Sequence, residues 1–147
     1  MAEKIFVSSS QMDLPIYRKA VQKTLLGMHV EPIMMEYFEA SRLTGTRASL
    51  RYVEESDIFV LIIGWRYGFP PPGFVISVTE MEYEAALKTQ MPILVYLAER
   101  ETLKDPISHH FVATGINIVA TSTETNPRWT WEQMWEKHQA FCQRVLT

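Results

Sequence analysis

One stretch of the chain limits the fold more than any other, because residues 58–63 (IFVLII) are apolar at every position. A strand with one face in water alternates apolar and polar residues, whereas a strand that is covered on both faces needs no polar positions. Strands of the second kind lie in the middle of parallel sheets whose faces are covered by helices. The run is far too short to span a bilayer, so it predicts a central buried strand and no membrane segment.

The segments around this strand alternate between strand patterns and helix patterns. Short apolar runs predict further strands over residues 4–7, 30–35, 92–97 and 116–121. Helix signals predict helices from about residue 14 to 27, over 46–56, from residue 77 or 79 to 89, and over 130–146. Such alternation is typical of right-handed βαβ units. The chain therefore predicts a three-layer α/β fold of the flavodoxin kind, with five parallel strands in the order 2-1-3-4-5.

Size and composition favour one soluble domain. The 147 residues match the usual length of a domain and contain no visible linker, so residues 1–147 are expected to fold as one unit. The net charge of -3, without a Lys/Arg cluster, argues against direct binding to nucleic acid. Cys142 is the single cysteine and the N-terminal residues show no signal peptide, so we expect a cytoplasmic location.

A ligand site is expected where the strand order reverses, outside the carboxyl ends of the first and third strands. The loops that leave these strands carry Ser8, Ser9 and Ser10 on one side and Gly64, Trp65 and Arg66 on the other. Serines and an arginine can hold a phosphate, and a tryptophan ring can stack on a base or on nicotinamide. The same residue types also serve as turn residues, as a cover for the end of the core and as solvated surface groups. Both interpretations stay open on sequence alone.

Three glutamates in the helix after the third strand have two interpretations as well. Ser77 with Glu80, and Thr79 with Glu82, each fit the S/T-x-x-E capping box, in which the glutamate only completes a helix start. Alternatively, one of Glu80, Glu82 and Glu84 faces a sugar, where a carboxylate can stabilise or attack an oxocarbenium-like centre.

Four blocks of sequence, in order, resemble the DUF4062 family. They are KIFVSS with the following DL and YR (residues 4–18), MEYFEAS (35–41), IIGWRYG (62–68), and SVTEMEYEAA (77–86) before the strand PILVYL (92–97). This family is similar to Toll/interleukin-1 receptor (TIR) domains and to nucleoside deoxyribosyltransferases in fold. The resemblance implies an effector or signalling domain, usually the N-terminal module of a larger protein with a STAND-type NTPase, and sometimes linked to antiphage defence.

The resemblance also implies a chemistry for one glutamate. Catalytic TIR domains hydrolyse the N-glycosidic bond of NAD with a glutamate in the helix after the third strand, followed four residues later by a small residue. Glu82 matches this pattern, with Ala86 four residues on and Ile93 at the start of the next strand. NAD or a related nucleotide is then a substrate, no separate cofactor is expected, and the partners are further copies of the chain or a fused or associated NTPase module. The proline-rich loop over residues 70–73 departs from most TIR loops.

Three functional hypotheses follow. In the first, Glu82 makes the domain an NAD glycohydrolase, with Ser8, Ser9 and Arg66 on phosphate and Trp65 on a ring. In the second, the domain is a non-catalytic self-association or docking module of a STAND-type NTPase. In the third, it is a nucleoside deoxyribosyltransferase-like enzyme with the same glutamate as nucleophile.

Other kinds of site find little support in the sequence. The chain has neither a P-loop nor a G-x-G-x-x-G motif. His109 and His110 are adjacent, which does not suit a shared metal ion, and no metal site is expected. His138 and Cys142 lie on the apolar face of the last predicted helix and are expected to be core residues.

Overall fold

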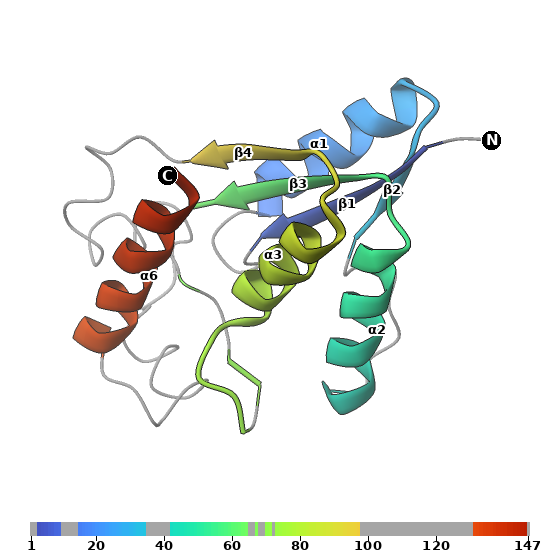
Figure 1. The fold of residues 1–147 in the computed structure, drawn as a ribbon. Coiled ribbons are helices and arrows are strands. Elements are labelled where there is room, and N and C mark those ends of the chain that lie inside the picture. The colour runs from blue at the N-terminus through green and yellow to red at the C-terminus, as the bar shows by residue number, and fades with distance from the viewer. Residues whose placement is uncertain are drawn as a thin grey trace.

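The computed structural model describes residues 3–9, 15–34, 42–64, 67, 70, 71, 73–97 and 131–146. Their elements, in chain order, are β1 (Lys4–Ser9), α1 (Pro15–Gly27), β2 (Glu31–Ile33), α2 (Arg42–Glu54), β3 (Ile58–Ile63), α3 (Val78–Thr89), β4 (Ile93–Leu97) and α6 (Trp131–Leu146). The strands form a parallel four-stranded sheet in the order β2-β1-β3-β4 (Figure 1). The α/β class and the order of the first four strands are thus confirmed. The fifth strand, predicted over residues 116–121, lies outside the described residues.

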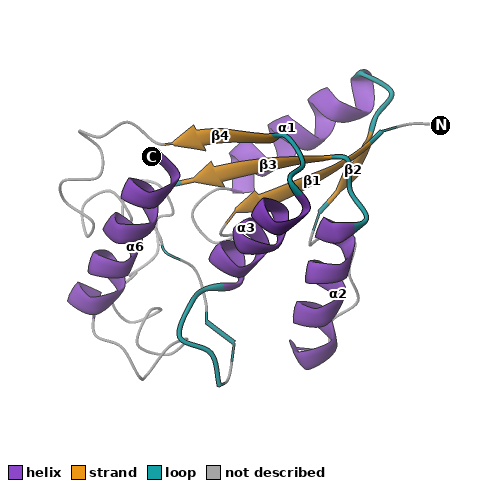
Figure 2. Ribbon diagram, viewed as in Figure 1, coloured by secondary structure: helices purple, strands orange, loops and turns teal. Residues whose placement is uncertain are grey.

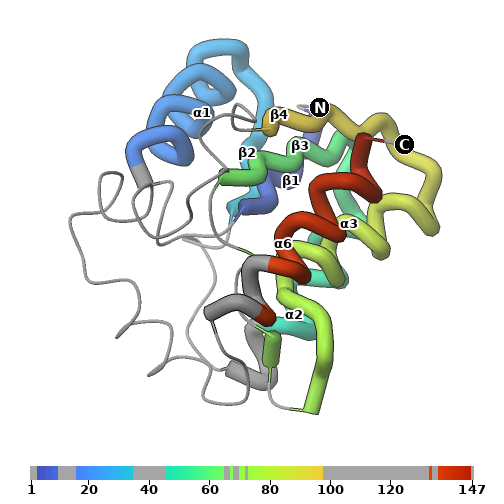
Figure 3. The backbone as a smooth tube through the Cα atoms, turned by 90° about the vertical axis from the view of Figure 1, so that its left-hand side faces the viewer, coloured from blue at the N-terminus to red at the C-terminus, as the bar shows by residue number. Residues whose placement is uncertain are grey.

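Helices cover both faces of the sheet, as Figure 2 shows. α1 lies on one face, and α2, α3 and α6 lie on the other, which is clearest in the end-on view of Figure 3. β3 runs between β1 and β4, and its residues alternate between two buried clusters, one beside α1 and the other beside α2, α3 and α6. This position explains why residues 58–63 contain no polar side chain, as the sequence predicted.

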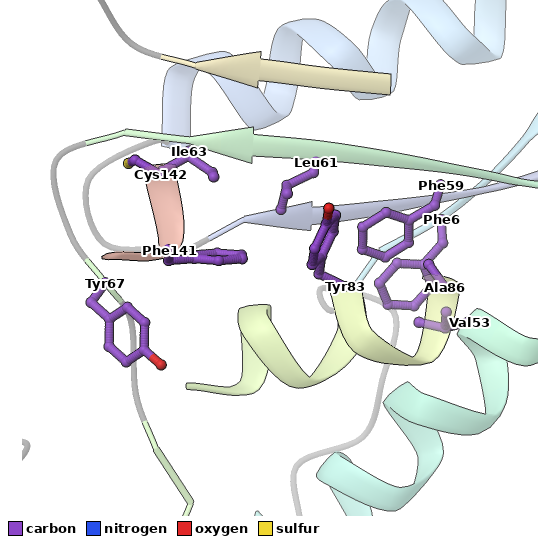
Figure 4. Close-up of a cluster of buried hydrophobic side chains, with 10 residues drawn as sticks. All are labelled: Phe6, Val53, Phe59, Leu61, Ile63, Tyr67, Tyr83, Ala86, Phe141 and Cys142. Carbon is purple, nitrogen blue, oxygen red and sulfur yellow. The ribbon is translucent and has the colours of Figure 1, made fainter. Parts of the chain in front are cut away.

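The larger cluster fills the space between the sheet and the three helices (Figure 4). Phe6 of β1 stacks on Phe59 of β3 with ring centroids 5.7 Å apart. Phe141 of α6 meets the rings of Tyr67 and Tyr83 edge to face, at 6.3 and 5.7 Å. These contacts attach α6, which follows the predicted range, to α3 and to the segment after β3. Of its predicted apolar face, the described residues His138, Phe141 and Cys142 are buried.

Two strands differ from the ranges that the sequence predicted. β1 continues through Ser8 and Ser9, which pair with Leu61 and Ile62 of β3, so the expectation that the serines end the strand is wrong for these two. Strand pairing outweighs the turn preference of serine here because β3 offers hydrogen-bonding partners along its whole length. β2 is only three residues long, and its Pro32 has no N–H for a ladder, which suits the edge of the sheet.

α3 begins and ends at recognisable caps. Ser77 is the N-cap of α3, with extended backbone angles, and its Oγ accepts a hydrogen bond from the Glu80 N–H at 3.2 Å. Of the two predicted starting points, Ser77 is therefore correct and Thr79 is not. Gln90 ends the helix in the left-handed conformation, with φ of 60°. α2 begins at Arg42, four residues before the predicted start. Within the described ranges, no helix combines the length and apolar character needed to cross a membrane.

Candidate functional site

Glu82 lies on the buried side of α3. The buried residues of this helix are Thr79, Glu82, Tyr83 and Ala86, spaced three, one and three residues apart, as one helical face requires. The Glu82 carboxyl group therefore points inward, on the same face of the helix as Tyr83 and Ala86. Glu82 is only 4% exposed, and charged residues are almost never buried so completely unless they are paired.

Two serines from different elements hold the Glu82 carboxyl group. The Ser8 hydroxyl, at the carboxyl end of β1, donates to Oε1 at 2.7 Å. The Ser49 hydroxyl, in the middle of α2, donates to Oε2. Both serines are fully buried. The carboxyl group therefore lies where β1, α2 and α3 meet, at the end of the sheet where the ligands of such folds bind.

Burial leaves this carboxyl group with an unusual proton affinity. Desolvation raises the pKa of Glu82 from its ordinary 4.5 to about 7, while hydrogen bonds from Ser49 and Ser8 and the charge of Arg18 act in the opposite direction. At neutral pH the protonated and ionised forms are therefore both populated. A carboxyl group of this kind can act as a base or as a stabilising anion near physiological pH.

A second polar pair lies on the opposite face of β1. Neighbouring residues of a strand point to opposite faces, so Ser8 faces α2 and α3 while Ser9 faces α1. There the Arg18 guanidinium donates to the Ser9 hydroxyl and, at 3.5 Å, to the Ser9 carbonyl oxygen. Arg18 is only 2% exposed, and its positive charge reaches Glu82 strongly enough to lower the pKa of that carboxyl group. The end of β1 thus has the Glu82 carboxyl group on one face and the Arg18 guanidinium cation on the other.

The remaining predicted site residues are placed only in part. Gly64 directly follows β3, is buried, and its carbonyl oxygen accepts a hydrogen bond from His138 Nε2 at 2.7 Å. Ser10, Trp65 and Arg66 lie outside the described residues, so their role stays a prediction.

Glu80 and Glu84 take part in a separate network. Arg144 of α6 donates to Glu80 at 2.7 Å and also to Glu84, and the Tyr67 hydroxyl donates to Glu80. Burial is the main cause that raises the pKa of this tyrosine above its usual range. These two glutamates hold α6 against α3. The capping interpretation of Glu82 is wrong, because Ser77 is the cap and the two Glu82 oxygens accept from Ser8 and Ser49.

His138 and Cys142 are core residues, as predicted. Donation from Nε2 to Gly64 defines the neutral tautomer, and desolvation lowers the pKa of His138 to about 4. Burial raises the pKa of the Cys142 thiol to about 11, so it stays protonated at neutral pH. Among the described residues, no group of three or more His, Cys, Asp or Glu side chains is placed to hold a metal ion.

Sequence analysis missed two members of the site, Arg18 and Ser49. Arg18 occupies the buried face of α1 with Leu25, seven residues on, whereas the neighbouring Tyr17 is 55% exposed. Ser49 is buried four residues before Val53 on α2. The signal in both cases is a polar residue at helical spacing from a core residue, which indicates a buried polar partner.

Comparison with known proteins supports the family resemblance. A family model described as a domain of unknown function (DUF4062) matches residues 4–145, which include every described residue of the site. The match extends beyond the sequence blocks that suggested it, through the C-terminal part of the chain. No curated protein matches the chain.

Proposed function

The chain belongs to the DUF4062 family, and from this membership and the placement of Glu82 we propose that the domain is a TIR-like effector that hydrolyses the N-glycosidic bond of NAD or a related nucleotide. One observation carries the proposal. Glu82 is a buried carboxyl group, held by Ser8 and Ser49 at the carboxyl end of the sheet, with a pKa raised to about 7.

The chemistry requires only one carboxyl group. When the bond between the ribose C1′ and the nicotinamide nitrogen breaks, the electron pair leaves with nicotinamide, which departs as a neutral molecule and needs no proton. Positive charge then develops on the ribose, and an ionised Glu82 stabilises it in surroundings of low dielectric constant. Water adds to C1′ and loses a proton, and the products are ADP-ribose and nicotinamide. Glycosidases use a second carboxyl group to protonate the leaving oxygen, a step that is absent here.

The ionisation of Glu82 gives this reaction a defined pH dependence. The anion is the useful form, so activity rises with pH as Glu82 loses its proton, with a midpoint near 7 in the free enzyme. Arg18 and the two serines favour that anion.

Because Glu82 is buried, the ribose reaches it only after surrounding parts of the chain move. Self-association is one way to drive such a movement. We expect the partner to be a further copy of the chain or an NTPase module. The expected location is the cytoplasm, and antiphage defence is one expected setting.

Nicotinamide release tests the proposal directly. Purified protein is mixed with NAD over a wide range of protein concentrations, and free nicotinamide is followed by chromatography. Glu82→Gln should lower the rate by about 100-fold or more, since removal of one stabilising group commonly costs that much. Glu84→Gln is the matched control, because it changes the same helix at a group whose described partner is Arg144, and it should keep the activity.

Two outcomes would instead support the alternatives that the sequence left open. If wild-type protein releases no nicotinamide at any concentration, the glycohydrolase proposal fails and a non-catalytic self-association or docking module remains. If the protein exchanges bases between deoxynucleosides, and Glu82→Gln stops the exchange, the deoxyribosyltransferase-like alternative is correct.

A further inference from the structure

Ser49 occupies a position in α2 where a hydroxyl group gives the helix no evident advantage. Alanine has nearly the same size and a higher helix propensity, and the position has no contact with solvent. Buried helical serines usually donate to a carbonyl oxygen of their own helix, four residues back. Ser56, just after α2, does this with the Tyr52 carbonyl oxygen at 2.6 Å. Ser49 instead donates away from its helix, to Oε2 of Glu82 on α3.

The direction of this hydrogen bond matters for the orientation of the carboxyl group. The last torsion of a glutamate side chain is soft, so a single donor leaves the carboxyl plane free to turn. Ser8 holds Oε1 from β1, and Ser49 holds Oε2 from α2. Two donors on two oxygens, carried by two different elements, set both the direction and the plane of the group.

Among the described residues, this arrangement leaves acceptor positions of the carboxyl group unused. An ionised carboxyl group offers about four acceptor positions, two on each oxygen. One position on each oxygen is used by a serine, so each oxygen can accept one more hydrogen bond, for example from a ribose hydroxyl. The serines thus orient the group without saturating it.

We infer that Ser49 is a positioning residue, whose hydroxyl holds the Glu82 carboxyl group in the plane from which it acts on the ribose. This inference rests on the proposed function. It assigns to α2, which lies beside α3 below the sheet in Figure 1, a role in the site as well as in the core.

A steady-state comparison of Ser49→Ala with Ser56→Ala tests the inference. Both changes remove one buried serine hydroxyl from the α2 region, but only Ser49→Ala removes a donor to Glu82. We expect kcat to fall about 10-fold to 100-fold in Ser49→Ala, as for loss of a hydrogen bond to a charged group, with KM changed by less than about twofold. Ser56→Ala should keep both constants. Circular dichroism checks that both variants fold.

The pH profile supplies a readout that a merely structural role would not change. Because the Ser49 hydrogen bond lowers the pKa of Glu82, its loss should move the acidic limb of kcat/KM to higher pH. The profile of Ser56→Ala should overlay that of the wild type. Equal activity and equal profiles for the two alanine variants would overturn the inference. Higher activity in Ser49→Ala would also overturn it, because Ser49 would then restrain the site.

A measurement without substrate separates this inference from the proposed function. In protein with ¹³C-labelled glutamate, the Glu82 carboxyl signal is identified by its loss in Glu82→Gln, and its titration is followed in wild type and Ser49→Ala. We expect the midpoint to rise in Ser49→Ala. If wild-type protein fails to hydrolyse NAD, the proposed function fails, and this titration still decides whether Ser49 holds Glu82. An unchanged midpoint would show that it does not.

Discussion

Replacing the buried carboxyl group should change how the stability of the protein depends on pH. In the unfolded chain Glu82 ionises near 4.5, whereas in the folded protein its pKa is raised to about 7. Between these values the unfolded state releases a proton that the folded state keeps. Rising pH therefore favours unfolding, and the stabilisation by Glu82 that is present below 4.5 is lost as the pH increases through 7.

The size of the effect follows from the two pKa values. Each tenfold change in proton affinity is worth about 1.4 kcal/mol, so a rise from 4.5 to about 7 amounts to about 3 kcal/mol. Glu82 has almost no contact with solvent, so screening by water reduces this figure little. Since whole domains are stable by only about 5–15 kcal/mol, the effect is large enough to measure.

His138 acts in the opposite direction over a similar pH range. Its pKa is lowered from 6.5 to about 4, so it destabilises the folded state as the pH falls from 6.5 to 4. In wild-type protein the two groups therefore nearly cancel between pH 4.5 and 6.5. Glu82→Gln removes one of them and should expose the other. We expect the unfolding free energy of this variant to rise with pH in that range by about 1.4 kcal/mol per pH unit more than that of the wild type.

Urea unfolding at several pH values between 4.5 and 8, followed by the fluorescence of the four tryptophans, measures this difference. Taking the difference between wild type and Glu82→Gln cancels the titration of every carboxyl group that both proteins share. Glu84→Gln is the control, since it makes the same substitution on the same helix at a side chain that is 37% exposed. A difference between wild type and Glu82→Gln that stays constant from pH 4.5 to 8 would refute the assignment of a raised pKa to Glu82.

Three further changes test the packing around the site. His138→Gln should reduce the loss of unfolding free energy between pH 6.5 and 4 by about 3 kcal/mol, measured by urea unfolding at both ends of that range, and an unchanged loss would contradict its low pKa. Ser77→Ala removes the acceptor for the Glu80 N–H and should cost about 1 kcal/mol in thermal unfolding; full stability would mean that the cap is dispensable. Phe141→Ala should cost about 3–5 kcal/mol in urea, because it empties a buried position against Tyr83, and a cost below about 1 kcal/mol would contradict the described attachment of α6.

The fold could be predicted in outline because its signals are local. The run at 58–63 has no polar position and therefore needs cover on both faces, and alternating strands and helices provide that cover. The ends of the elements were less predictable. Ser8 and Ser9 have turn preferences of their own, but strand pairing with β3 decides their conformation. Tyr17 and Arg18 are neighbours on α1, and only the packing of the helix against β1 decides which of them is buried.

By itself, the sequence determined the class of the fold, the strand order over the first four strands and the family, and it predicted Glu82 as the site carboxyl group only through the family resemblance. The tertiary structure decided the surroundings of that carboxyl group, because Ser8, Ser49 and Arg18 lie 74, 33 and 64 positions away from it along the chain. Hydrophobic periodicity reports which side of a helix or strand is buried, but it does not report which residue of another element lies opposite. The proton affinity of Glu82 depends on those distant neighbours and on the exclusion of water, so it could be read only once β1, α1, α2 and α3 were packed together.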